Sequence, residues 1–150
     1  MIQTSDAGDV SNREVINKRV FNAPRERVFK AWTDPAQLVQ WWGPKGFTNT
    51  FHKHDPRPGG VWNLTMHGPD GANYENTWVY VEINEPELIV LEHTTPPKFR
   101  LTATFEDQAG KTLLTFRMTF QSADECGKLK PICEPCNEQN LDRLEAVLGL

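Results

Sequence analysis

The sequence has no long apolar run and no segment that resembles a signal peptide. None of its apolar stretches approaches the roughly 20 residues that a helix needs to cross a bilayer. Residues 1–12 are polar and acidic, whereas a signal peptide has a basic start followed by an apolar segment. We therefore expect a cytoplasmic protein with no membrane partner. Residues 1–12 should form a flexible tail, and residues 13–150 a single domain.

Clustered positive charge is also missing, and the formal net charge is -4. Arg25, Arg27 and Lys30 are interrupted by Glu26, which fits a solvated helix face. Because phosphate recognition needs clustered Lys and Arg, the sequence does not predict a nucleic-acid partner. Glycine-rich phosphate loops are absent too, since Gly59-Gly60 precedes a strand rather than a helix.

Cysteine is scarce, with Cys126, Cys133 and Cys136 all in the last quarter of the chain. An odd number of cysteines without a secretion signal favours reduced thiols. The Cys133/Cys136 spacing would suit a zinc-ligand pair or a redox couple. A structural zinc site, however, needs four ligands, and a redox pair normally opens a helix that follows a strand. We interpret the pair as small residues at a helix start, and predict neither a metal nor a cofactor.

The histidines and carboxylates form no recognisable catalytic group. His52 and His54, at i and i+2 of one strand, should face the same side and point to solvent. His93 is placed near a cavity mouth, although a structural role is favoured for it. Glu75, Glu82 and Glu92 lie inside strands, and the sequence does not show which of their side chains point into the protein. We therefore predict no catalytic residue, and an enzyme is not the favoured interpretation.

The pattern of apolar residues predicts an α+β fold. Alternating segments about ten residues apart indicate an antiparallel meander, and Asn137, Leu141, Leu144 and Leu148 form one stripe of a last helix. A lone helix with one apolar stripe must bury it against the sheet. The expected elements are a strand at 13–22, helices at 25–33 and 35–42, strands at 47–55, 61–67, 73–83, 88–94, 98–106 and 111–120, a helical turn at 122–128, and a helix from about 134 to 148.

Aromatic content is high, with five Trp and eight Phe residues. A bent sheet that grips one helix leaves space that side chains fill incompletely, and small-molecule pockets have apolar walls with a few polar groups. In the strand at 73–83, one face would carry Tyr74, Asn76, Trp78, Tyr80 and Glu82, but the pattern does not decide which face looks inward. The predicted cavity residues are Trp62, Leu64, Met66, Tyr74, Trp78, Tyr80, His93, Leu101, Phe116, Asn137 and Leu141.

Several motifs occur in a recognisable order: Val20-Phe21-Asn22-Ala23-Pro24, Val28-Phe29-Lys30-Ala31-Trp32-Thr33-Asp34-Pro35, Trp41-Trp42-Gly43-Pro44, Gly46-Phe47, Arg57-Pro58-Gly59-Gly60-Val61-Trp62, Met66-His67-Gly68-Pro69-Asp70-Gly71 and Leu141-Asp142-Arg143-Leu144. Together they resemble one known family, the homologues of the heat-shock-protein-90 ATPase activator C-terminal domain. The resemblance covers about residues 13–150 and implies the helix-grip architecture of the START-like superfamily. In that architecture a curved antiparallel sheet, with two short helices after its first strand, wraps around a long C-terminal helix.

The resemblance implies less about activity. Members of the superfamily bind lipids, hormones or polyketides, and some catalyse cyclisation. The leading hypothesis is binding of a small apolar or aromatic molecule in an internal cavity, in stress response or detoxification. An enzyme acting on an aromatic or polyketide substrate, with His93, Tyr74 or a strand glutamate as acid–base group, is a second hypothesis. A chaperone-associated module is a third; the short tail before Arg13 disfavours it, because the eukaryotic activators carry an additional N-terminal domain. A homodimer through edge strands is left open.

One departure from the family pattern concerns the last helix. Relatives often have Gly-Trp where this chain has Cys136-Asn137. We expect Asn137 and Asn140 to direct amide groups toward the cavity, where an indole would otherwise fill space. The pocket should therefore be more open and more polar at that end.

Overall fold

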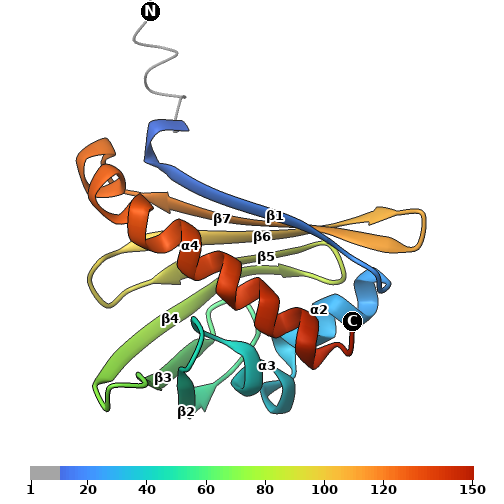
Figure 1. The fold of residues 1–150 in the computed structure, drawn as a ribbon, viewed down its shortest axis with the longest axis horizontal. Coiled ribbons are helices and arrows are strands. Elements are labelled where there is room, and N and C mark those ends of the chain that lie inside the picture. The colour runs from blue at the N-terminus through green and yellow to red at the C-terminus, as the bar shows by residue number, and fades with distance from the viewer. Residues whose placement is uncertain (1–10) are drawn as a thin grey trace, which may run out of the picture.

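A computed structural model describes residues 11–150, which form a seven-stranded antiparallel sheet with a long helix lying diagonally across it (Figure 1). Residues 1–10, most of the expected tail, lie outside the described part. The strand order is β1-β7-β6-β5-β4-β3-β2. In chain order the elements are η1 (Ser11–Arg13), β1 (Glu14–Phe21), α2 (Arg25–Thr33), α3 (Pro35–Trp41), β2 (Thr48–His54), β3 (Val61–His67), β4 (Asn73–Asn84), β5 (Leu88–His93), β6 (Phe99–Gln108), β7 (Lys111–Phe120) and α4 (Ala123–Val147).

The sheet is a meander of hairpins that β1 completes by pairing with β7. The two short helices follow β1, as expected, and pack near the C-terminal end of α4 (Figure 1). Pro24 stands immediately before α2, and Asp34 caps α3 by accepting a hydrogen bond from the Ala36 amide at 3.1 Å. These arrangements confirm the predicted α+β helix-grip fold.

A bulge in β4 alters the faces predicted for that strand. The pairing with β5 shifts register between Tyr80 and Glu82. A bulge inserts one unpaired residue, so the alternation of side chains is displaced beyond it. As a result Ile83 packs against the core and Glu82 is exposed, whereas Glu82 was expected on the face of Tyr80.

A second bulge, in β2, separates the two histidines that were expected on one side. The register shifts between Phe51 and Lys53. His54 lies on the inner face, with Nε2 2.9 Å from the Tyr80 hydroxyl. His52 lies on the outer face, with Nε2 2.7 Å from Thr65 Oγ1. The prediction of a solvent-facing pair was therefore wrong.

Helix α4 is one continuous helix of 25 residues, whereas a separate turn and a later helix were expected. Pro131 and Pro135 lie inside it; each removes one backbone donor, but the remaining bonds and the packed inner face maintain the helix. Ser122 caps it by accepting a hydrogen bond from the Glu125 amide at 3.1 Å. The Cys133/Cys136 pair thus lies within the helix and not at its start. No helix within residues 11–150 is long and apolar enough to cross a membrane.

Part of the interior is filled by an aromatic cluster made of the five tryptophans. Each is at most 4% exposed. Their rings meet mainly edge to face; the Trp32 and Trp41 centroids, for example, are 5.0 Å apart at 67°. Trp41 Nε1 also donates to the Ala31 carbonyl at 2.9 Å. This cluster limits the space left for a ligand and determines where that space lies.

Candidate functional site

A pocket of about 210 Å³ remains between the sheet and α4. Strands β3 to β7 supply one wall, α4 supplies the facing wall, and the α3–β2 loop closes a third side. Aromatic and sulfur-containing side chains dominate the lining. The lining residues are Trp42, Gly43, Pro44, Met66, Asn76, Trp78, His93, Phe99, Leu101, Phe116, Met118, Cys133, Cys136, Asn137 and Asn140.

The loop wall of the pocket is held in place by Arg143 of α4. Its Nη1 donates to the carbonyls of Trp42, Gly43 and Pro44 at 3.1, 2.9 and 3.1 Å. Its Nη2 donates to those of Gln40 and Phe47, both at 2.9 Å. Burial lowers the pKa of Arg143, and no carboxylate pairs with it among the described residues. Arg143 therefore binds a loop of neutral carbonyl groups.

Gly43 allows this loop to lie close to the sheet. Its φ is +98°, and a Cβ at this position would lie 2.9 Å from Met66 Cε. Glycine is the residue that adopts positive φ without strain and leaves this space free. The backbone of the loop and the Met66 side chain therefore form one continuous surface of the pocket.

His93 belongs to the pocket wall, but its ring nitrogens are engaged by the protein. The Nδ1 atom lies 2.8 Å from the Pro97 carbonyl oxygen, and Nε2 lies 2.6 Å from Asn76 Oδ1. The ring stacks on Phe99 with centroids 4.8 Å apart. Burial lowers the pKa of His93, and only 6% of the residue is exposed. Both ring nitrogens therefore face oxygen atoms of the protein.

The family model described as "Activator of Hsp90 ATPase homolog 1-like protein" matches residues 22–149. The chain belongs to this family. The resemblance drawn from the sequence motifs is thereby confirmed, as is membership of the START-like superfamily, whose helix-grip folds commonly bind hydrophobic ligands. A search among curated proteins finds no match.

Solved structures of similar proteins share the whole architecture. A protein from Arthrobacter aurescens is 27% identical with a TM-score of 0.86, and the match covers 94% of this chain and 88% of that one. A protein from Mycobacterium smegmatis is 27% identical with a TM-score of 0.81, covering 94% of both chains. A third, from Nitrosomonas europaea, is 18% identical with a TM-score of 0.85, covers 93% of this chain and 96% of that one, and shows the fold alone.

Six of the eleven residues predicted to line a cavity do line the pocket: Met66, Trp78, His93, Leu101, Phe116 and Asn137. Four others, Trp62, Leu64, Tyr80 and Leu141, lie buried outside it, at most 2% exposed. Tyr74 is 47% exposed and packs against Phe47, with ring centroids 5.9 Å apart. Burial raises the pKa of Tyr80, whose hydroxyl bonds to His54.

Asn140, whose amide was expected to point toward the cavity, also lines the pocket. The other lining residues were not predicted, and those of the α3–β2 loop are the clearest case. The motifs containing Trp42 and Arg143 are both visible in the sequence, but about a hundred positions separate them. Phe99 and Met118 lie on strands in which apolar and polar residues alternate. Their inward direction follows from that alternation once the inner face of the sheet is known. For Cys133 and Cys136 the signal was hidden by the assumption that the helix begins near residue 134.

The Asn137 side chain connects α4 to β1 as well as facing the pocket. Its Nδ2 donates to Asn17 Oδ1 at 3.1 Å and lies 3.3 Å from Met118 Sδ. The second expected amide, Asn140, donates to the Trp41 carbonyl at 2.7 Å. Within the described residues these bonds use nitrogen only, so the Asn137 oxygen remains available as an acceptor. Trp78 contributes a buried indole N–H that has no partner among residues 11–150.

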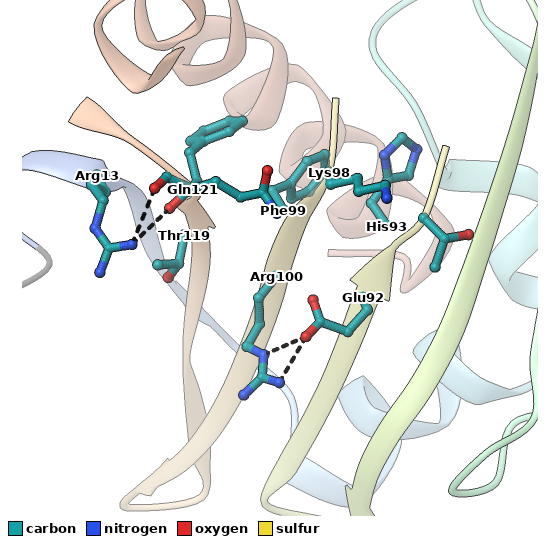
Figure 2. Close-up of a pocket in the computed structure, with 10 residues that line it drawn as sticks. Arg13, Glu92, His93, Lys98, Phe99, Arg100, Thr119 and Gln121 are labelled. Carbon is teal, nitrogen blue, oxygen red and sulfur yellow. Dashed lines mark hydrogen bonds and ion pairs between the residues drawn. The ribbon is translucent and has the colours of Figure 1, made fainter. Parts of the chain in front are cut away.

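A second pocket of about 450 Å³, with several charged lining residues, lies at the ends of β5, β6 and β7 (Figure 2). Three of its charged side chains are already engaged. Arg100 Nη2 lies 2.7 Å from Glu92 Oε1, and Arg13 donates to the Phe120 and Gln121 carbonyls at 3.4 Å. By strand alternation, Glu92 and Arg100 are on the outer face, away from α4. The sheet thus separates this pocket's ion pair from the inner pocket.

Proposed function

We propose that this protein binds a small aromatic or apolar molecule carrying one polar group, in the pocket between the sheet and α4. The observation that carries the proposal is the lining: aromatic rings and sulfur atoms surround the space, and few polar atoms face it. Pockets of this composition are typical of small-molecule sites. The Asn137 oxygen would accept, and the Trp78 indole N–H would donate, one hydrogen bond each.

The volume defines the size of the proposed ligand. At about 210 Å³ the pocket is smaller than the roughly 300–1,000 Å³ of sites for drug-sized molecules. An apolar cavity of about 150 Å³ takes up benzene. A compound of one or two rings, such as phenol or indole, therefore suits the space, whereas a multi-ring polyketide requires the helix or the loop to move.

Binding without chemistry is favoured over catalysis by the polar groups at the site. Among the described residues that line the pocket there is no Asp, Glu, Lys or Arg. His93 has both ring nitrogens engaged, and Tyr74, the other proposed acid–base residue, lies outside the pocket. We infer sequestration of a small aromatic compound, which fits the detoxification role expected from the resemblance.

Titration with indole and phenol, followed by isothermal titration calorimetry, tests the proposal. Trp42 and Trp78 line the pocket, so a bound aromatic ring would contact them, and a saturable heat of binding should be measured. Asn137→Trp should fill the space and abolish the response. Ile132→Trp is the matched control, because position 132 is on the same helix but 60% exposed, and it should bind as the wild type does. Unchanged affinity in Asn137→Trp would refute the proposed site.

A further inference from the structure

Sulfur is concentrated in one place in this molecule. The whole chain has three cysteines and three methionines. Four of these six residues line the pocket under α4: Met66, Met118, Cys133 and Cys136. Thiolates and thioethers are the ligands preferred by soft elements. The pocket wall therefore has a chemical character that a merely apolar binding site does not need.

The two cysteines are spaced so that one atom can bridge them. They stand at i and i+3 of α4, where helix geometry places their Cα atoms about 5 Å apart. That separation lies within the range across which paired cysteine sulfurs can be joined. Both side chains are half-buried at the pocket, so they are reachable from it. Cys126, in contrast, is buried outside the pocket.

The apolar surroundings of Cys133 and Cys136 disfavour a ligand that would form a charged complex with the two sulfurs. Burial raises the pKa of Cys133 to about 11, because a thiolate in this environment is poorly solvated. No Lys or Arg among the described residues lines the pocket to balance a bis-thiolate complex of a monovalent cation. A zinc site of the usual kind needs more ligands, and the described residues contain no cluster of three His, Cys, Asp or Glu side chains suited to a metal ion. A ligand that bridges both sulfurs and leaves a neutral product fits best.

We propose that Cys133 and Cys136 form a dithiol site for an aryl arsenic(III) compound. Such a compound, written R–As(OH)₂, reacts with two thiols by exchange. Two As–O and two S–H bonds break, two As–S bonds form, and two water molecules leave. Arsenic stays trivalent, so no oxidant or reductant takes part, and the product is neutral. The aryl group would lie against Trp42, Phe99 and Phe116. In this last respect the inference rests on the proposed function, since the pocket must accept an aromatic ring.

Phenylarsine oxide added to the reduced full-length protein tests the site. Intact-mass spectrometry in excess glutathione should show one adduct per chain, because a chelating dithiol outcompetes a monothiol. Cys133→Ser and Cys136→Ser should each weaken retention by about 100-fold or more, the size of an effective-concentration advantage. Cys126→Ser should retain the adduct as the wild type does. Alanine variants at both positions, checked by circular dichroism, provide a second set in case a serine variant misfolds.

Parallel titration with indole keeps the two proposals distinguishable. If indole binds but the arsenical is lost to glutathione, the dithiol site is refuted and the proposed function stands. If the arsenical is retained through both cysteines but indole does not bind, the dithiol site stands and the proposed function fails. Equal retention by Cys133→Ser, or loss of retention in Cys126→Ser, overturns the assignment of the thiols. Retention in Asn137→Trp equal to that of the wild type would refute the placement of the aryl group in the pocket.

Discussion

Replacing Arg143 with methionine should destabilise the fold more than replacing Arg19, which forms ion pairs with α4. Methionine keeps much of the apolar stem and removes the guanidinium. The change therefore isolates five hydrogen bonds, four to the α3–β2 loop and one to the Gln40 carbonyl in α3. Arg19 offers a matched comparison. It lies 2.8 to 3.4 Å from carboxylate oxygens of Glu138, Asp142 and Glu145 on the same helix.

Removing Arg143 leaves backbone carbonyls without a donor, whereas removing Arg19 leaves carboxylates that water can solvate. A hydrogen bond to a charged group contributes about 1.5–3 kcal/mol, but five bonds that share one guanidinium are not additive. Some of the freed carbonyls will also regain water. We therefore expect Arg143→Met to cost about 3 kcal/mol, or a fall in Tm of roughly 10 °C for a chain of this size. Exposed ion pairs contribute about 0–1 kcal/mol, so Arg19→Met should cost about 1 kcal/mol.

Urea denaturation at low and high salt separates the two cases. Ion pairs among exposed carboxylates are screened, so the cost of Arg19→Met should shrink as salt rises. The cost of Arg143→Met should change little, because its partners are neutral. If Arg19→Met proves equally costly, or if salt removes the Arg143 effect, the interpretation of Arg143 as the anchor of the pocket loop is refuted.

Two further predictions concern pH and one close backbone contact. Burial lowers the pKa of His54 and of His93. Below about pH 6.5 these two side chains therefore become protonated in the unfolded chain while they stay neutral in the folded protein. The free energy of unfolding should fall as pH drops through that value, by at most about 1.4 kcal/mol per pH unit for each histidine, and then level off. Urea midpoints measured between pH 8 and pH 5 test this. Replacing both histidines with glutamine should reduce the dependence of stability on pH. Gly43→Ala should cost about 1–3 kcal/mol in the same assay, and more than Gly59→Ala. Both positions have positive φ, but a Cβ at position 43 would also lie 2.9 Å from Met66 Cε and 3.2 Å from Phe47 Cβ, whereas one at position 59 meets nothing within 4 Å.

Much of the fold could be predicted from local patterns. The strands at 61–67 and 111–120 begin and end where alternation indicated, and α2 occupies the expected residues 25–33. These elements share a simple cause: their periodicity is uninterrupted and their limits coincide with proline, glycine or a capping residue. Local sequence and tertiary packing agree there, so sequence reasoning succeeds.

The bulges and the continuous last helix could not be predicted in this way. An extra residue at Val81 leaves the sequence alternation intact and changes only which side chains face inward beyond it. Pro131 and Pro135 are ordinary helix-ending signals, and only the packing of α4 along the sheet overrides them. The Arg143 contacts depend on residues about a hundred positions away, for which a single sequence holds no local signal.

The position of the pocket follows from side-chain size along the inner face of α4. Toward the C-terminus this face carries Leu141, Leu144 and Leu148, each at most 2% exposed, and the interior there is closed. One or two turns earlier the same face carries Cys133, Cys136 and Asn137, which are smaller, and there the space remains. A tryptophan buries roughly 150–250 Å² of surface, so an indole in place of Asn137 would occupy much of the volume that is now empty. Residues 136 and 137 therefore leave the space open and place a thiol beside it, which is why the pocket and the dithiol are best tested together.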